Sequence, residues 1–383
     1  MMNEKEIIRI SSPYVTKEKD GLARLCADVT IHGKTGQLWY GVEERYENAL
    51  TKDRLDPFAV TLLHIAMHMG ADIVCEAPVS ARLLYKINNT FIPALTFADS
   101  TLKDIKVIAK PAEACETKGA VGCSCSFGLD SLYTIRENRG GEYPITHICL
   151  FNAGTFEGEN GRELFRRHYG LVKDYAEKLG LKSLAVDTNL HEVLNERYMD
   201  IGSERQLGVI LALQGLFGAY HYSSSHLESE FHFDMHEDSS YDPLSIDCFT
   251  TDSLCLFLSG ASVSRIDKLL YIADHKEEAA MMHPCFKKFV WEKNCGKCMK
   301  CIRDMLPIYA VGKTDCFSEA FDFEGFEKKI PTYLAFVMAR SENDLMKSVL
   351  EFWKDRGLSI PKKSYVYEAK FRSSMKNLEE NGL

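Results

Sequence analysis

The sequence predicts an α/β protein built around a parallel sheet, with an N-terminal α+β region and a helical C-terminal region. Between residues 116 and 283, short apolar runs alternate with helical patterns, which is typical of βαβ units. A loop of small residues at 122–131 lies within this region, and four cysteines gather at 285–301 directly after it. These observations predict the fold class and indicate where the chemistry lies.

Length and pattern divide the chain into three regions. Its 383 residues exceed one typical domain. We expect an N-terminal α+β domain, a central sheet domain, and a region of cysteines and helices, with boundaries at 1–115, 116–283 and 284–383. The N-terminal domain carries no chemical motif, so we expect it to bind a substrate or partner or to form a homo-oligomer contact.

Local patterns give the individual elements. Strands are expected at 7–10, 27–31, 37–42, 105–109, 146–151, 183–186 and 219–222. Helices are expected to begin at Asp56, where Pro57 follows, and at Ser80, and to span 162–179 and 207–217. The spacing after the cysteines is helical again from residue 302 onward.

Polar residues follow two strands of the central region. Asn152 comes after the strand at 146–151, and Asp187 comes after the strand at 183–186. Parallel sheets bind ligands at the carboxyl ends of their strands, so we expect Asn152 and Asp187 to contact a bound nucleotide. The same residue types are common in turns, which makes a structural role the alternative.

The loop at 122–131 has the composition of an anion-binding loop. It follows the β-prone segment 105–109 across a polar connection, and a helical pattern begins directly after it. A helix N-terminus presents backbone N–H groups and a positive dipole to an anion. The hydroxyls of Ser126 and Ser131 add donors, and the carboxylate of Asp130 can hold Mg²⁺. A turn that caps an ordinary helix is the alternative.

Four cysteines have the spacing of a metal site. Cys285 is followed by Cys295, Cys298 and Cys301, with nine, two and two residues between them. Four thiolates with short Cys-x-x-Cys segments suit a tetrahedral Zn²⁺ ion in a structural site. An iron–sulfur cluster is the alternative, because cysteine ligands alone do not separate the two metals.

The hexapeptide at 126–131, Ser-Phe-Gly-Leu-Asp-Ser, resembles the Ser-Gly-Gly-x-Asp-Ser signature of the PP-loop ATP pyrophosphatase superfamily. The resemblance implies a Rossmann-like domain at 116–283 that binds ATP and splits it between the α- and β-phosphates. It implies that the nucleotide is bound by Ser126, Gly128, Leu129, Asp130 and Ser131. Phe127 stands where the signature has its first glycine, which changes the approach of the backbone to the phosphates.

A PP-loop followed by a four-cysteine knuckle is similar to the layout of the 7-cyano-7-deazaguanine synthase family. The similarity covers residues 118–310 and is specific only at the loop and the knuckle. It implies ATP-dependent adenylation of a carboxylate or amide oxygen, followed by attack of a nitrogen nucleophile. The substrate would be a small molecule or a modified base of the 7-deazaguanine type, and the nucleophile ammonia or a protein amine.

Arg265 and Lys268 lie three residues apart at an expected helix start. Both face the same side of such a helix, so together they can bind phosphate oxygens and neutralise charge as pyrophosphate leaves. We therefore expect Asp130, Arg265 and Lys268 to be the catalytic residues. A solvated surface turn with Asp267 as the partner is the alternative.

Two other classes of function stay open. A sulfur-transferring PP-loop enzyme acting on tRNA or a small molecule would need a persulfide cysteine, for which Cys125 is the candidate, or a labile iron–sulfur cluster. A nucleotide-sensing interaction protein would have lost catalysis through Phe127. The histidines between residues 221 and 236 are better explained by a lid than by a second metal site.

Composition restricts the partners. The formal net charge is −9, with 26% charged residues and 45% hydrophobic residues, so nucleic acid is possible but not favoured. No apolar stretch is long enough to cross a membrane, and the N-terminus lacks a signal-peptide pattern. With thirteen cysteines, a reducing cytoplasm is the expected location.

Overall fold

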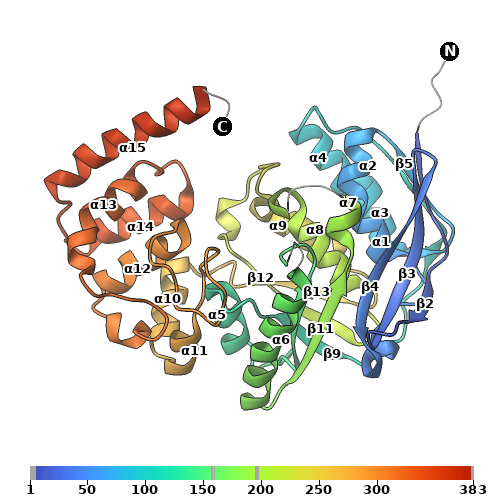
Figure 1. The fold of residues 1–383 in the computed structure, drawn as a ribbon. Coiled ribbons are helices and arrows are strands. Elements are labelled where there is room, and N and C mark those ends of the chain that lie inside the picture. The colour runs from blue at the N-terminus through green and yellow to red at the C-terminus, as the bar shows by residue number, and fades with distance from the viewer. Residues whose placement is uncertain (1–5, 157, 159, 195–197, 381–383) are drawn as a thin grey trace. The chain divides into compact units, whose positions relative to one another are not determined.

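The computed structural model describes residues 6–156, 158, 160–194 and 198–380 (Figure 1). The chain divides into two compact units. Unit 1 comprises residues 1–125 and 134–261, and unit 2 comprises residues 126–133 and 262–383. Each unit therefore contains two separate segments of the chain.

The strands are β1 (Ile7–Ile10), β2 (Tyr14–Lys17), β3 (Leu22–Ile31), β4 (Lys34–Glu43), β5 (Asp72–Cys75), β6 (Val79–Ser80), β7 (Val107–Ile108), β8 (Pro111–Ala112), β9 (Ala120–Ser124), β10 (His147–Asn152), β11 (Lys182–Thr188), β12 (Phe217–Ser223) and β13 (Cys255–Ser259). The helices are α1 (Asp56–Thr61), α2 (Leu63–Met69), α3 (Ala81–Lys86), α4 (Ile92–Ala98), α5 (Leu129–Glu137), α6 (Gly161–Lys178), α7 (Leu190–Leu194), α8 (Tyr198–Leu211), α9 (Asp242–Phe249), α10 (Arg265–Ala273), α11 (Lys276–Met281), α12 (Met299–Ala310), α13 (Phe326–Met338), α14 (Asp344–Asp355) and α15 (Lys362–Glu380). Shorter helical turns are η1 (Glu44–Ala49), η2 (Ile87–Phe91), η3 (Glu228–Glu230), η4 (Asp238–Tyr241) and η5 (Thr314–Phe317).

The parallel part of the sheet in unit 1 has the strand order β11-β10-β9-β12-β13. Numbered along the chain from β9, this is the order 3-2-1-4-5 of doubly wound sheets. Helix α6 packs against β10 and β11, and α9 packs against β13. The predicted α/β fold with a largely parallel sheet is confirmed, and its order is compatible with a Rossmann-like fold. The strand order reverses beside β9. Sheets of this kind bind ligands at the carboxyl ends of the strands where the order reverses, so the loop that follows β9 begins at such a position.

The N-terminal strands extend this same sheet. β4 pairs antiparallel with β11, with Gly41 opposite Asp187, and the order continues β4-β3-β1-β5-β7. The β3–β4 hairpin turns at His32 and Gly33, whose φ angles of 48° and 73° suit a two-residue hairpin turn. The compact units therefore differ from the three-part division expected from the sequence, because strand pairing joins the first region to the second.

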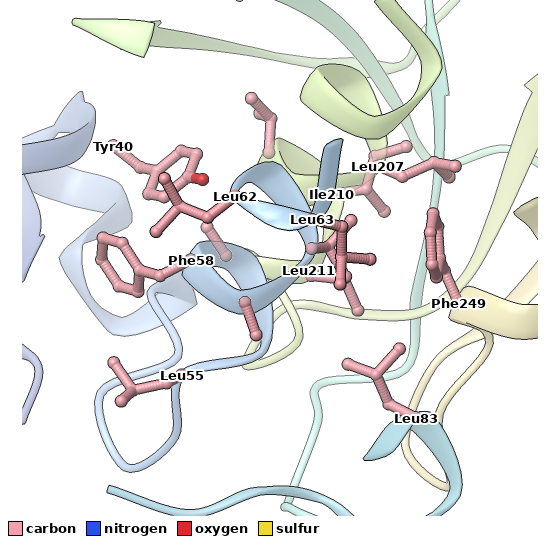
Figure 2. Packing of buried hydrophobic residues seen from close by; sticks show 14 of the residues in the cluster. Tyr40, Leu55, Phe58, Leu62, Leu63, Leu83, Leu207, Ile210, Leu211 and Phe249 are labelled. Carbon is pink, nitrogen blue, oxygen red and sulfur yellow. The ribbon is translucent and has the colours of Figure 1, made fainter. Parts of the chain in front are cut away.

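Helices α1 and α8 pack closely in the core of unit 1 (Figure 2). Glycine is needed at position 208, since a Cβ atom there would lie 2.3 Å from Cγ2 of Thr61. The buried residues labelled in this view are Tyr40, Leu55, Phe58, Leu62, Leu63, Leu83, Leu207, Ile210, Leu211 and Phe249. The expected helix starts at Asp56 and Ser80 are both confirmed, because α1 begins at Asp56 and Ser80 is the N-cap of α3.

Two expected elements differ from the structure. Of segment 105–109, only Val107–Ile108 forms a strand, and it pairs with β5. The strand before the loop is β9, which includes residues 122–124 of the expected loop. The helix expected at 207–217 ends at Leu211, and Phe217 begins β12. This stretch is almost completely buried, so hydrophobic periodicity could not indicate where the helix stops.

Unit 2 contains helices around the segment that carries the cysteines. Helix α12 packs against α13 and α14, and α13 packs against α15. The rings of Tyr309 on α12 and Trp353 on α14 stack with centroids 6.3 Å apart. These contacts hold α12, which carries residues of the candidate site.

Candidate anion and metal sites

Asp130, Arg265 and Lys268 form one ion-pair network in unit 2. Nη1 of Arg265 lies 2.7 Å from Oδ2 of Asp130, and Nζ of Lys268 lies 3.2 Å from Oδ1 of the same carboxylate. Arg265 also binds Asp304 through two hydrogen bonds, from Nε at 3.1 Å and from Nη2 at 3.2 Å. The three residues expected to act together therefore lie in contact, although Asp130 is 135 positions from Arg265 in the sequence.

The network is buried and carries more positive than negative charge. The side chains of Lys268 and Asp304 are each 2% exposed, that of Arg265 is 8% exposed and that of Asp130 is 20% exposed. Arg303 also contributes a cation. Burial alone would raise the pKa of Asp130, but the charges of Arg265, Lys268 and Arg303 outweigh it and hold this pKa well below its usual range. Such a group of cations suits an anionic ligand.

Local structure positions the cations. Ser264 is the N-cap of α10, and its Oγ accepts a hydrogen bond from the backbone N–H of Asp267 at 3.1 Å. This cap fixes the first turn of the helix, where Arg265 and Lys268 lie on one face. Asp267 therefore bonds to the cap residue Ser264, whose Oγ donates to its carboxylate at 2.6 Å, while Asp130 and Asp304 bind the cations.

The loop at 126–131 is closed by its serine side chains. Oγ of Ser131 donates to the carbonyl of Gly128 at 3.0 Å and accepts from the backbone N–H of Ser126 at 3.3 Å. Oγ of Ser126 accepts from the N–H of Gly128 at 3.3 Å. Helix α5 begins at Leu129, so the N–H groups of its first turn, including that of Asp130, have no acceptor within the helix. These are the groups that an anion can bind.

Phe127 adopts the backbone conformation that glycine favours. Its φ angle is +58°, which is uncommon for a bulky residue. The ring is buried, and the carbonyl oxygen accepts a hydrogen bond from the backbone N–H of His283 at 2.7 Å. Phe127 is therefore a left-handed residue in this loop, held by its buried ring and by the hydrogen bond to His283.

The carboxylate of Asp130 is shared between two cations in this arrangement. One oxygen lies in an ion pair with Arg265 and the other in an ion pair with Lys268. An ionised carboxylate accepts about four contacts in all, so each oxygen keeps acceptor capacity beyond these two. The role expected for Asp130 as a magnesium ligand stays a prediction, and the excess of cations in the network suits phosphate oxygens.

The four cysteines lie together, and they could hold a metal ion such as zinc. The Sγ atoms of Cys285, Cys295, Cys298 and Cys301 all lie within 4.8 Å of one another. Three of these Sγ–Sγ distances are 3.3 Å for Cys298–Cys301, 3.8 Å for Cys295–Cys301 and 3.9 Å for Cys298–Cys285. With Zn–S bonds of about 2.3 Å, the sulfurs of a tetrahedral site lie about 3.8 Å apart. The spacing therefore fits one tetrahedral ion, whereas the thiolates of a multi-iron cluster bind different irons.

Backbone groups support this cysteine cluster. The N–H groups of Lys297 and Cys298 donate to Sγ of Cys295 at 3.4 and 3.3 Å. Burial raises the pKa of Cys295, but these donors outweigh it and lower the pKa to about 7. The buried Asn294 side chain accepts from the N–H of Cys285 at 3.2 Å and donates to the carbonyl of Ala320 at 2.8 Å. Such outer hydrogen bonds hold metal ligands in place.

The cysteine cluster and the ion-pair network share structural elements. Helix α12 carries Cys301 and, three residues later, Asp304. On the other side of the cluster, His283 precedes Cys285 by two residues and holds the carbonyl of Phe127. A metal bound to the cysteines would therefore fix both the loop and the acid that orients Arg265.

In unit 1, the two residues expected at the strand ends are neighbours. Asn152 ends β10 opposite Asp187 on β11, and its Nδ2 donates to Oδ1 of Asp187 at 2.7 Å. The other oxygen of Asp187 lies 3.2 Å from Nε of Arg162. The amide oxygen of Asn152 is buried and has no hydrogen-bond partner among the described residues, so it is available to a ligand donor. Their nucleotide contacts stay predictions.

His221, Cys123 and Cys125 lie in the protein interior. His221 lies within β12, where its ring contacts Ser259 Oγ at 2.8 Å and the carbonyl of Tyr143 at 2.9 Å. Cys123 is buried, which raises its pKa well above the usual value, and Cys125 is also buried. Among the described residues, no helix is both long and apolar enough to cross a membrane.

Sequence reasoning missed Asp304, His283 and Asn294. The position of Asp304 could have been predicted from the sequence. It follows Cys301 by three residues and so lies on the same face of any helix that begins at the cysteines. His283 acts through its backbone, and Asn294 acts through contacts with distant carbonyls, neither of which a residue pattern reveals. No protein-family model matches this chain, and no curated protein or solved structure matches it either.

Proposed function

We propose that this chain binds ATP through the loop at 126–131 and transfers AMP to a carboxylate or amide oxygen of a second substrate. The observation that carries the proposal is the convergence of Asp130, Arg265 and Lys268 at the first turn of α5. A buried network with excess positive charge, beside free N–H groups of a helix, has the chemistry needed to bind polyphosphate. The doubly wound strand order, with the loop following β9, supports it.

In the proposed reaction, an oxygen of the substrate attacks the α-phosphorus and the bond to the β-phosphate breaks. Pyrophosphate leaves with the electron pair, and Arg265 and Lys268 stabilise its negative charge. A nitrogen nucleophile then attacks the activated carbon and AMP leaves. By resemblance to the 7-cyano-7-deazaguanine synthase family, the substrate is a 7-deazaguanine-type base that carries a carboxylate, and the nucleophile is ammonia or an amine of a protein.

We assign a structural zinc ion to the four cysteines. Such an ion contributes to folding and has no open position for a substrate. Metal analysis of the purified protein tests this assignment. One zinc per chain is expected, and bound iron with sulfide would show that the cluster alternative is correct.

A nucleotide-sensing protein without catalysis is the second candidate. It is favoured by the ion pairs of both Asp130 oxygens with Arg265 and Lys268, because a magnesium ion at this carboxylate would have to compete with two cations already bound there. A sulfur-transferring enzyme has less support, since its candidate cysteine, Cys125, is buried, whereas reactive cysteines are at least partly exposed.

The test is the formation of AMP and pyrophosphate from ATP in the presence of 7-carboxy-7-deazaguanine and an ammonium salt. We expect Lys268→Met to lower the rate about 100-fold or more, as is typical when a group that stabilises transition-state charge is removed. Lys276→Met, which removes an exposed lysine of α11, is the matched control. ATP binding without cleavage would favour the sensing protein, and no ATP binding would exclude both candidates.

A further inference from the structure

The loop that joins the cysteines has an exposed basic and aromatic surface. We call residues 286–300, without Cys295 and Cys298, the lysine–aromatic loop. Phe286 is 60% exposed and Phe289 is 48% exposed. Two large exposed rings therefore lie within four residues of each other in this short segment.

The aromatic rings are arranged for stacking. The rings of Phe289 and Trp291 are nearly parallel, with an interplanar angle of 16° and centroids 4.9 Å apart. Two lysines, Lys287 and Lys288, separate Phe286 from Phe289 in the sequence, so the rings form no continuous apolar face. A flat ring flanked by cations suits a nucleobase with its phosphates better than it suits the interior of a lipid layer.

The charge of the loop is strongly positive, in contrast to the chain as a whole. It contains five lysines, all exposed, and one acid, Glu292. Glu292 is already bound by Lys288, whose Nζ lies 3.0 Å from Oε1. Lys300 lies near the charges of Arg265, Arg303, Asp130 and Asp304 and is left out of this surface. The other three lysines, Lys287, Lys293 and Lys297, form no ion pair with any residue that the structure describes. Their charge is therefore available to a polyanion.

We propose that the lysine–aromatic loop binds single-stranded nucleic acid. Unpaired bases stack on exposed aromatic rings, while lysines neutralise the backbone phosphates, and this combination binds with little dependence on sequence. A duplex hides its base faces and cannot use the rings. The cysteines at both ends of the loop would keep the rings and lysines on a rigid support. The inference is independent of the proposed ATP chemistry, because it uses different residues.

The experiment titrates the metal-loaded full chain into fluorescein-labelled oligouridine of about 12 nucleotides and measures fluorescence anisotropy. Three phosphate contacts predict a slope of about −2.1 in the log–log dependence of the binding constant on salt, or about 20-fold weaker binding when salt rises from about 50 to about 200 mM. Phe289→Ala should weaken binding about 5- to 160-fold, the range that corresponds to loss of one stacked base.

Paired substitutions test the electrostatic part. Lys287→Gln with Lys293→Gln should reduce the salt slope by about 1.4. The control, Lys328→Gln with Lys329→Gln, removes two exposed lysines of α13 and should leave binding unchanged. Metal content and the thermal unfolding midpoint of each variant establish that the fold is intact.

Four results would overturn the inference. They are no binding at low salt, equal binding of duplex and single strand, equal loss in the α13 control, and binding of vesicles with anionic lipid in preference to the oligonucleotide. ATP binding, measured in parallel on the same preparations, separates this inference from the proposed function. Intact ATP binding with no binding of oligouridine would remove this inference alone.

Discussion

The role of Asp304 in orienting Arg265 gives the most quantitative prediction. Asp304 is 2% exposed and holds the Arg265 guanidinium through two hydrogen bonds at 3.1 and 3.2 Å. Removal of one partner of a buried ion pair costs about 3–5 kcal/mol. Arg265 keeps its contact with Asp130 at 2.7 Å, so we expect Asp304→Asn to lower the free energy of unfolding by about 3 kcal/mol, the lower end of this range.

A surface ion pair provides the matched control. Nζ of Lys313 lies 3.1 Å from Oδ1 of Asp274, whose side chain is 71% exposed. Exposed pairs contribute at most about 1 kcal/mol, so Asp274→Asn should have a small effect although the distance is the same. Urea unfolding followed by tryptophan fluorescence measures both variants. Combining Asp304→Asn with Arg265→Gln should cost clearly less than the sum of the single changes. Equal effects of Asp304→Asn and Asp274→Asn, or full additivity with Arg265→Gln, would refute the network.

Three further predictions concern unit 1. Burial, and then the charge of Lys182, lowers the pKa of His147 from 6.5 to about 4. The free energy of unfolding should therefore fall by about 3 kcal/mol as pH drops from 6.5 to 4. His147→Gln should flatten this pH dependence when unfolding by urea is measured at each pH. Burial, and then repulsion by Asp238, raises the pKa of Glu204, so the stability of the fold is lost as pH rises through that pKa. Glu204→Gln should therefore raise the melting temperature above neutral pH but not in acid. An equal gain at all pH values would contradict ionisation of Glu204 as the source of the lost stability. Gly208→Ala should lower the melting temperature, because its Cβ would overlap Thr61 of α1, and an unchanged midpoint would mean that the two helices can separate without cost.

Much of the fold could be predicted because its signals are local. The strands at 146–151 and 183–186 are short apolar runs bounded by polar turns, and the structure has β10 and β11 there. The cysteine spacing predicted a four-residue cluster, which the structure contains. The cations at 265 and 268 were predicted from their spacing at a helix start, and that helix is α10.

What the sequence could not reveal depends on contacts between distant segments. The pairing of β4 with β11 joins Val42 to Val186, and neither strand pattern indicates which neighbour it takes. β9 contains Gly122, whose missing side chain leaves room for the ring of Tyr220, 2.4 Å from where a Cβ would lie. In isolation such small residues favour a loop, so tertiary packing decides that this segment is a strand.

A crystal structure of the metal-loaded protein with a non-hydrolysable ATP analogue tests the proposed site most directly. We expect the phosphates to lie against the N–H groups that begin α5, with Arg265 and Lys268 bound to phosphate oxygens. A nucleotide bound elsewhere, or a loop that stays closed by its own serines while Arg265 and Lys268 keep only their carboxylate partners, would contradict the proposed AMP transfer.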